Sequence, residues 1–217
     1  MVFAGTGAII VNDVTNGQVG NIGIGLTFGM VVMVMIYVLS PISGAHLNPA
    51  VTVAFWITRS FDMRWSLGYI CSQLLGAAAA STLLHWLFPQ HPTLGATLPH
   101  GSAIQSFILE ILLAFILVFA ILMIAKKATE KRFAPAVVIG SIIALGAIFA
   151  GPISGASMNP ARSLAPAFLS GEIQSLWIYL LAPVLGALIA VPVSNFLDAK
   201  ELTPPVLRYR FPSRKRL

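Results

Sequence analysis

One ten-residue stretch occurs twice in this chain, and it constrains the fold more than any other feature. Residues 41–50, PISGAHLNPA, return 111 residues later as residues 152–161, PISGASMNPA, with eight of the ten positions identical. A lone Asn-Pro-Ala commonly marks a turn or a helix start, whereas two copies in a shared context indicate an internal repeat. In an apolar chain, interrupted segments at matching places in two halves predict a binding or conduction site.

The surroundings of the repeat are apolar: 57% of the 217 residues are hydrophobic and only 9% are charged. A soluble domain carries about 25% charged residues, so the composition predicts a protein of the lipid bilayer. The net charge of +6 would suggest a nucleic-acid partner if the basic residues formed one face. The basic residues do not form such a face, and we expect no nucleic-acid partner. The single Cys71 lies in an apolar run and is expected to be buried.

Apolar segments long enough to cross a bilayer occur at 22–39, 65–87, 104–125, 134–150 and 174–196. Residues 1–11 form a shorter apolar stub, and each copy of the repeat leads into an apolar run too short to span. We therefore expect one domain, residues 1–197, with repeat one at about 1–88 and repeat two at about 104–197. A basic tail, residues 198–217, follows. Three spans in each half would place the halves in opposite orientations, as an inverted repeat.

The basic residues support this topology. Alternating spans place the 59–64 turn, the 126–132 loop and the tail on one side, which then holds twelve of the thirteen Lys and Arg residues. The positive-inside rule makes that side cytoplasmic, so we expect an integral protein of the cell (plasma) membrane with a cytoplasmic tail. Binding of lipid headgroups or of a partner is the alternative explanation for the basic tail. Arg162 is the one basic residue that this topology does not place on the cytoplasmic side.

Each Asn-Pro-Ala predicts a helix start, because Asn is a favoured N-cap and Pro a favoured first helical residue. The two helices, about 49–57 and 160–169, are half the length of a span and must begin near the midplane. Opposite orientations then bring Asn48 and Asn159 face to face. The preceding Ser-Gly-Ala residues should be irregular backbone, which is tolerated at this depth only when it is buried in protein or lines a watery cavity.

Such an arrangement predicts a pore for neutral molecules. Each helix N-terminus carries about +0.5 elementary charge, so their meeting point repels cations and protons, while the two Asn amides donate hydrogen bonds to a passing oxygen. We expect pore-lining carbonyls at Gly44, Ala45, His46, Gly155 and Ser157. The alternative is that the two stretches are buried turns that merely cap core helices.

Three further polar side chains lie at membrane depth. Arg162 costs at least about 2.5 kcal/mol there, so it should face a wet cavity unless it extends to the membrane surface. Glu110 either braces backbone N–H groups of a loop or relays protons. His46 either lines the inner vestibule or bonds the loop. The other histidines have no partners at metal-ligand spacing, so no metal and no cofactor are expected.

At these residues the chain resembles the aquaporin, or major intrinsic protein, family, closest to its nodulin-type and related bacterial solute channels. Both Asn-Pro-Ala copies are intact, and the second continues into Arg162 and Ser163. The resemblance implies an all-α membrane protein with six spans and two re-entrant half-helices. It also implies one pore per protomer, a homotetramer, and a pairing of Asn48-Pro49-Ala50 with Asn159-Pro160-Ala161 at the pore centre.

The family's narrowest point is a ring of four residues, and the resemblance carries it onto Phe28, Ala147, Ala156 and Arg162. Water-selective members usually have His at the position of Ala147 and Cys or another residue at that of Ala156, so this ring should be wider and less polar. Glycerol channels usually follow the Arg with Asp, where this chain has Ser163. The resemblance thus implies passage of glycerol, urea or metalloid acids with some water.

The stub also matches the family. Val2-Phe3-Ala4 repeats residues 118–120 of the fourth span, so the resemblance implies that the start of the first span is absent. That portion would carry the counterpart of Glu110, which family members use to brace a re-entrant loop. A truncated chain and a misassigned start codon are both consistent with this.

The sequence therefore predicts a passive channel for water and small uncharged solutes that excludes protons and ions. It does not predict an enzyme, because no nucleophile–base pair, metal cluster or phosphate loop is evident. The alternatives are a strictly water-selective aquaporin, a non-conducting relative, and a secondary transporter, which would need coupling-ion ligands at the midplane.

Overall fold

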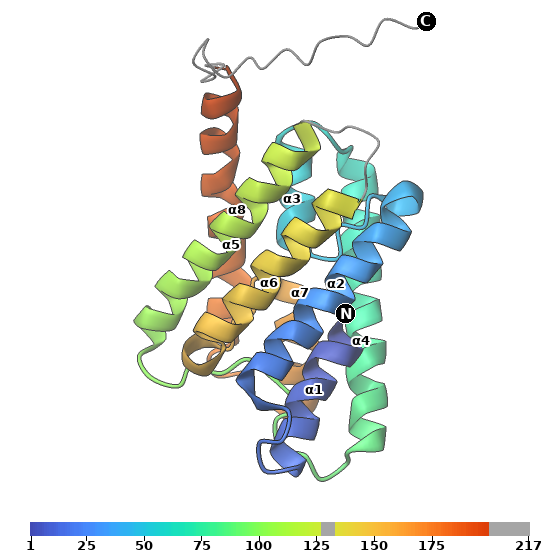
Figure 1. Ribbon diagram of the computed structural model, residues 1–217, viewed down its shortest axis with the longest axis vertical. Coiled ribbons are helices and arrows are strands. Elements are labelled where there is room, and N and C mark those ends of the chain that lie inside the picture. Colours follow the sequence, from blue (N-terminus) through green and yellow to red (C-terminus); the bar gives the residue numbers. More distant parts are fainter. Residues whose placement is uncertain (127–132, 200–217) are drawn as a thin grey trace, which may run out of the picture.

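The computed structural model describes residues 1–126 and 133–199, and its regular elements there are helices (Figure 1). In chain order they are α1 (Val2–Val14), α2 (Gly20–Ser43), α3 (Pro49–Ile57), α4 (Met63–Leu87), α5 (Ala103–Lys126), α6 (Phe133–Ser154), α7 (Pro160–Ser170) and α8 (Leu176–Ala199). Most of the basic loop at 126–132 and nearly all of the expected tail lie outside the described residues.

The predicted fold class is confirmed. Within the described part of the chain, five helices are long and apolar enough to cross a membrane, namely α2, α4, α5, α6 and α8. α3 has 9 residues and α7 has 11, and a rise of about 1.5 Å per residue makes each about half as long as a span. α1 is a shorter apolar helix of 13 residues.

The spanning helices pack in two long pairs, α2 along α6 and α5 along α8. Small residues allow these backbones to approach closely. A β-carbon on Gly29 would overlap the carbonyl oxygen of Gly140, and one on Gly186 would overlap the carbonyl oxygen of Ile111. Such contacts between small residues are what hold helices together where lipid surrounds them.

The half-helices lie inside this frame, with α3 in the upper half of Figure 1 and α7 in the lower half. Their N-termini meet near mid-height, because α3 runs away from the centre in one direction and α7 in the other. The upper end of the molecule holds the start of α4, the end of α5, the start of α6 and the end of α8. There the Lys126 ammonium donates to the Ser194 carbonyl oxygen at 3.0 Å.

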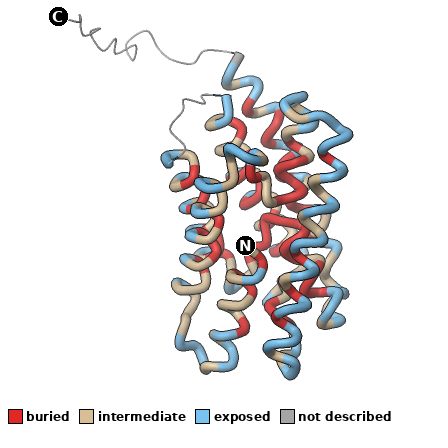
Figure 2. The backbone as a smooth tube through the Cα atoms, turned by 90° about the vertical axis from the view of Figure 1, so that its right-hand side faces the viewer, coloured by how far each residue is buried: buried red, intermediate tan, exposed pale blue. Residues whose placement is uncertain are grey.

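Buried residues gather toward the interior and exposed ones face outward (Figure 2). The outward face is apolar, with Leu75 71%, Trp86 75% and Phe149 67% exposed, as expected for a surface that meets lipid. The expectation that Cys71 is buried is wrong, because its side chain is exposed. An apolar run in a membrane helix does not imply burial, since α4 turns one side outward.

Two helix ends differ from the expected ones. α2 and α6 continue past 39 and 150 through Pro41 and Pro152 to their ends at Ser43 and Ser154. Proline removes one N–H donor but leaves its carbonyl as an acceptor, and helical bonding is the cheapest way to satisfy backbone in an apolar medium. The irregular stretches are therefore shorter than expected, covering only residues 44–47 and 155–158.

α1 also runs further than expected. It includes Asn12 and Asp13, which lie beyond the expected apolar stub of residues 1–11. The connection to α2 is short, and the Asn12 side-chain oxygen closes it by accepting a hydrogen bond from the Gly20 N–H at 2.8 Å. Two polar residues in a row, Asn12 and Asp13, therefore do not mark the end of this helix.

Candidate functional site

The first re-entrant loop (residues 44–47) and the second re-entrant loop (residues 155–158) share one backbone conformation. The dihedral φ is positive at the same three places in each, at Gly44 (73°), Ala45 (47°) and Leu47 (52°), and at Gly155 (83°), Ala156 (43°) and Met158 (53°). Residues other than glycine adopt such angles at a cost of about 1–3 kcal/mol each. The repeat in the sequence is therefore a repeat in conformation, and the surroundings of the loops must hold it.

Both half-helices begin as predicted. The Asn48 side-chain oxygen accepts from the Ala50 N–H at 2.9 Å, and that of Asn159 accepts from the Ala161 N–H at 3.0 Å. Pro49 and Pro160 are the first helical residues, so they and the two alanines shape the helix starts. Each asparagine satisfies a donor that the first helical turn would otherwise leave unpaired.

The two asparagines also join the loops to each other. The amide nitrogen of Asn48 donates to the Met158 carbonyl oxygen at 2.7 Å, and that of Asn159 donates to the Leu47 carbonyl oxygen at 2.9 Å. This exchange is symmetric, since each amide bonds the residue that precedes the other asparagine. It brings the two helix N-termini face to face at the centre of the molecule.

A cavity of about 280 Å³, here called the central cavity, runs past this junction. All four residues of the predicted ring line it, and so do both asparagines. It extends from Ser40, Ala125 and Pro135, at the end of the molecule where α5 ends and α6 begins, to Phe28 and Arg162. The structure thus brings together residues from five helices and both re-entrant loops around one passage.

Not every residue expected on the wall is there. Gly44, Ala45, His46 and Ser157 line the central cavity, but Gly155 is not among its lining residues. A β-carbon on Gly155 would lie 3.0 Å from the Cγ2 methyl carbon of Thr97, so Gly155 packs behind the wall. The expectation of a pore-lining carbonyl there is corrected accordingly.

The wall of the central cavity has two characters. Along one side run the re-entrant loops with their asparagines and backbone oxygens. The opposite side is apolar and comes from α2, α5 and α6, with Val32, Ile36, Leu117, Ile121, Ile139 and Ile143. Methionine sulfur is also present, because Met1 and Met158 line the cavity and the Met1 sulfur lies 4.0 Å from the Asn159 amide nitrogen.

Arg162 is the charged residue of the wall. Its side chain does not extend to the membrane surface, because the residue is only 2% exposed. One terminal nitrogen, Nη1, donates to the Gly95 carbonyl oxygen at 2.9 Å, and the guanidinium carbon lies 5.0 Å from the centre of the Phe28 ring. Its Nε has no hydrogen-bond partner among the described residues. A cation over an aromatic face is favourable where water is scarce.

Glu110 lies behind the second re-entrant loop and is fully buried. Its carboxylate accepts three hydrogen bonds, from the Ser154 hydroxyl at 2.8 Å, the Ser157 N–H at 2.9 Å and the Met158 N–H at 2.9 Å. Of the two roles considered for this residue, the geometry favours bracing of the loop. These are backbone donors that the loop itself cannot satisfy.

Of the two roles considered for His46, the structure favours lining of the cavity, and its polar contact is to α3 and not to the loop. It lines the central cavity, and its Nδ1 lies 3.1 Å from the Thr52 hydroxyl. The imidazole stacks on Phe55 with ring centres 4.8 Å apart, and Phe61 and Tyr69 close around it at 4.8 and 5.2 Å. The first re-entrant loop is thus fixed by aromatic packing.

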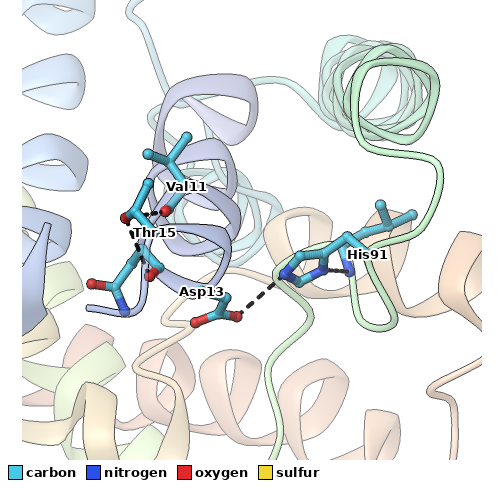
Figure 3. Close-up of polar contacts among 6 residues, drawn as sticks. Val11, Asp13, Thr15 and His91 are labelled. Atoms are coloured by element: carbon cyan, nitrogen blue, oxygen red, sulfur yellow. Dashed lines mark hydrogen bonds and ion pairs between the residues drawn. The ribbon is translucent and has the colours of Figure 1, made fainter. Parts of the chain in front are cut away.

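Residues 88–102, here called the outer loop, contain Gly95, and a contact with α1 that no motif indicated helps to fix this loop. The His91 Nε2 lies 3.3 Å from an Asp13 carboxylate oxygen, while the His91 Nδ1 accepts from the Leu94 N–H at 3.0 Å (Figure 3). Asp13 and His91 are 78 positions apart, so no spacing could have paired them. Neither residue was given a role from the sequence.

Among the described residues, no group of three or more His, Cys, Asp or Glu side chains converges to hold a metal ion. The polar groups that line the central cavity include amides, carbonyls, hydroxyls, the His46 imidazole and the Arg162 guanidinium. Such a set can pass hydrogen bonds to a neutral molecule.

A family model described as Major intrinsic protein matches residues 1–193. The chain belongs to this family. The match covers both re-entrant loops, all the half-helix residues and α8 as far as Val193. The resemblance inferred from the two Asn-Pro-Ala copies is thereby confirmed.

Curated relatives in this family include aquaporins of the nodulin type. Aquaporin NIP1-1 of Oryza sativa subsp. japonica is 44% identical over 188 residues, which cover 86% of this chain and 66% of that protein. Nodulin-26 of Glycine max is 41% identical over 196 residues, covering 90% and 72%. The chain spans about two thirds of the length of the rice relative.

Among solved structures, the X-ray structure of the aquaglyceroporin from Plasmodium falciparum is similar to this fold. The TM-score is 0.79 at 28% sequence identity, and the match covers 91% of this chain and 89% of that one. The match covers most of the chain, and the aquaporin-like arrangement of helices is thus a property of this chain.

Proposed function

We propose that this protein is a passive transmembrane channel for water and small neutral solutes that excludes protons and ions. The observation that carries the proposal is the central cavity, which passes between two helix N-termini and is lined by both of their asparagines. Each amide uses one hydrogen on the opposite loop. The second hydrogen of Asn48 remains for the oxygen of a passing molecule, and that of Asn159 meets only the Met1 sulfur at 4.0 Å, a weak acceptor that such an oxygen can replace.

Charge supports the exclusion of cations. Two helix N-termini contribute about half a positive charge each, and the guanidinium of Arg162 adds a full one. No carboxylate is among the residues that line the central cavity in the described part of the chain. Glu110 faces the loop backbone, and its carboxylate oxygens accept hydrogen bonds from three donors. A cation in the central cavity therefore meets a positive potential without a negative charge to balance it.

The two-sided wall supports passage of small polyhydroxy or amide solutes. Hydroxyl groups of such a solute can follow the line of carbonyls and amides, while its carbon side lies against the isoleucines and leucine opposite. At the ring, Ala147 and Ala156 present only methyl groups beside Phe28 and Arg162. Glycerol, urea and metalloid acids are the solutes we propose.

The main alternative is a strictly water-selective aquaporin. It would require the ring to exclude a three-carbon solute, and two alanines leave room that larger polar residues would fill. A secondary transporter is disfavoured because, within the described residues, no pair of carboxylates lies at the midplane to bind a coupling ion. A non-conducting relative would leave the central cavity without a role.

We further propose a homotetramer in the cell membrane with the C-terminal residues on the cytoplasmic side, and a single channel domain over residues 1–197. Exposed apolar side chains along α2, among them Ile22, Met30 and Ile42, offer a surface for lipid or for a second copy. The described basic residues Arg59, Arg64 and Lys126 belong to one end of the molecule, which supports the orientation.

Stopped-flow light scattering on proteoliposomes tests the proposal. We expect glycerol and urea to enter faster than in protein-free liposomes, with rates that persist when ion gradients are collapsed. Water flux with both solutes excluded would favour the water-selective alternative. Dependence of solute entry on an ion gradient would favour a transporter, and no excess flux of any kind would contradict the channel.

A further inference from the structure

Three buried hydroxyl groups lie in a row directly behind the ring. The Thr97 hydroxyl is 2.8 Å from that of Ser163, and the Ser163 hydroxyl is 2.5 Å from that of Ser157. Thr97 belongs to the outer loop, Ser163 to α7 and Ser157 to the second re-entrant loop. Their residues are 3%, 0% and 6% exposed, so bulk water does not compete for these bonds.

Counting hydrogens gives the three hydroxyl groups one consistent direction. When the Ser157 hydroxyl donates its single hydrogen to the Asn159 carbonyl oxygen at 3.0 Å, it accepts from the Asn159 N–H at 3.2 Å. Ser163 then donates to Ser157, and Thr97 donates to Ser163. The row, here called the hydroxyl chain, runs one way and ends on the asparagine of the pore centre.

Each member of the hydroxyl chain is close in sequence to a part of the ring. Ser163 follows Arg162, and Ser157 follows Ala156. Thr97 lies two residues after Gly95, whose carbonyl oxygen holds the Arg162 guanidinium. The hydroxyl chain therefore connects the holder of the arginine to the opposite side of the ring, through the interior and outside the passage.

Packing reinforces this connection on the same side. The methyl group of Thr97 lies against Gly155, where an added β-carbon would come within 3.0 Å. Three residues further along the outer loop, the His100 N–H donates to the Ile153 carbonyl oxygen at 2.9 Å. The outer loop is thus seated on the second re-entrant loop around the hydroxyl chain.

We propose that Thr97, Ser163 and Ser157 are positioning residues that set the width of the ring and thereby the size of solute that it admits. This inference rests on the proposed channel function. The hydroxyl chain touches no solute at Thr97 or Ser163, which are not among the lining residues of the central cavity. It acts by fixing the distance between Arg162 and Ala156.

Thr97→Val tests the hydroxyl chain with little change of shape. Valine keeps the methyl contact with Gly155 but donates no hydrogen bond, so the Ser163 oxygen loses its partner and the outer loop loses one tie. We expect the permeability ratio of erythritol to glycerol to rise roughly fivefold, the factor associated with one net hydrogen bond. Water permeability should change less than about twofold, because water already passes the narrower ring.

Three companion variants make the result specific. Ser163→Ala breaks the hydroxyl chain at its middle and should raise the same ratio, and it serves in place of Thr97→Val if that variant does not fold. Thr97→Ser restores the donor and should return the ratio to that of the native chain. Thr93→Val is the matched control, because Thr93 lies in the same loop and its hydroxyl has no hydrogen bond within the described structure.

The measurement is stopped-flow swelling of proteoliposomes with glycerol and erythritol, on variants that unfold cooperatively in detergent. A raised ratio in Thr97→Val and Ser163→Ala, with native ratios in Thr97→Ser and Thr93→Val, supports the inference. If the native chain conducts glycerol and the folded variants keep its ratio, the inference is wrong while the channel stands. If the native chain conducts nothing above protein-free liposomes, the proposed function fails first and the inference with it.

Discussion

The two re-entrant loops have the same backbone and different surroundings. Residues 44–47 and 155–158 repeat three positive φ angles in order, and their asparagines exchange equivalent hydrogen bonds. Around the first loop the fixing groups are rings and uncharged polar side chains. Around the second they are a carboxylate, a guanidinium and three hydroxyls. The repeated residues thus determine the path of the chain, and the residues outside the repeat determine what each loop can do.

The difference is largest in charge. Glu110 and Arg162 both belong to the second loop's surroundings, where low polarity strengthens their interactions. At the first loop, the Tyr69 hydroxyl donates to the Ser43 carbonyl oxygen at 2.9 Å and the Gln73 amide donates to the Thr52 hydroxyl at 3.0 Å. Losing a neutral bond costs less than leaving the partners of a buried charge unpaired. The second loop should therefore be the more sensitive of the two.

The largest effect is expected for Glu110→Ala. It leaves the N–H groups of Ser157 and Met158 without an acceptor, each at a cost of about 1–3 kcal/mol, while the Ser154 hydroxyl keeps only the Ala150 carbonyl oxygen at 3.4 Å. We expect the unfolding temperature in detergent to fall by roughly 10 °C, followed by calorimetry or fluorescence. Glu172→Ala, at a half-buried position between α7 and α8, is the control and should unfold with the native chain. Equal unfolding temperatures for both variants would contradict the bracing role.

Arg162→Ala should have the next largest effect, on selectivity. It removes the positive charge of the wall, and we expect proton leak through proteoliposomes to rise on the order of tenfold, the factor for about 1.4 kcal/mol of lost barrier. A pH-sensitive dye inside the liposomes reports the leak. Arg64→Ala, an exposed arginine at the start of α4, should leave the leak unchanged. Background leak in both would mean that Arg162 is not a charge filter.

His46→Phe probes the first loop and should have a moderate effect. Phenylalanine can keep the stacking on Phe55 but loses the contact with the Thr52 hydroxyl. We expect a loss of about 1 kcal/mol in the free energy of unfolding and no added proton leak. A proton leak as large as that of Arg162→Ala would show that both loops exclude charge, and would contradict the assignment of charge exclusion to the second loop. His100→Phe, in the exposed part of the outer loop, is the control.

The smallest effect is expected for Tyr69→Phe, which deletes only the hydrogen bond to the Ser43 carbonyl oxygen. The free energy of unfolding should fall by about 1 kcal/mol or less, with unchanged solute flux. Tyr37→Phe is matched, because the Tyr37 hydroxyl has no hydrogen bond among the described residues. A loss in Tyr69→Phe comparable to that of Glu110→Ala would overturn the ranking of the two loops.

The parts of the fold that follow from local chemistry were predictable. Asn is a favoured N-cap and Pro a favoured first helical residue, so α3 and α7 could be placed to within one residue. The long spans could be placed from the length of their apolar runs. The ends of two of them at Ser43 and Ser154 could not, because helical hydrogen bonds continue past a proline where no water is available to bond the backbone.

The contacts between distant segments were not predictable in the same way. The ring residues were located through the family resemblance, and the structure does place all four on one cavity. Gly95 and Thr97 lie in a loop of ordinary turn residues, and nothing in their sequence indicates that they meet Arg162 and Ser163. The pairing of His91 with Asp13 is likewise a product of how α1 and the outer loop pack.

We expect the meeting point of the two helix N-termini to let neutral molecules pass and to exclude charged ones. Glycerol entry and proton entry measured on the same batch of proteoliposomes test it most directly. We expect glycerol entry well above that of protein-free liposomes, together with proton entry at the protein-free level. Proton entry that rises in step with glycerol entry as more protein is reconstituted would contradict it.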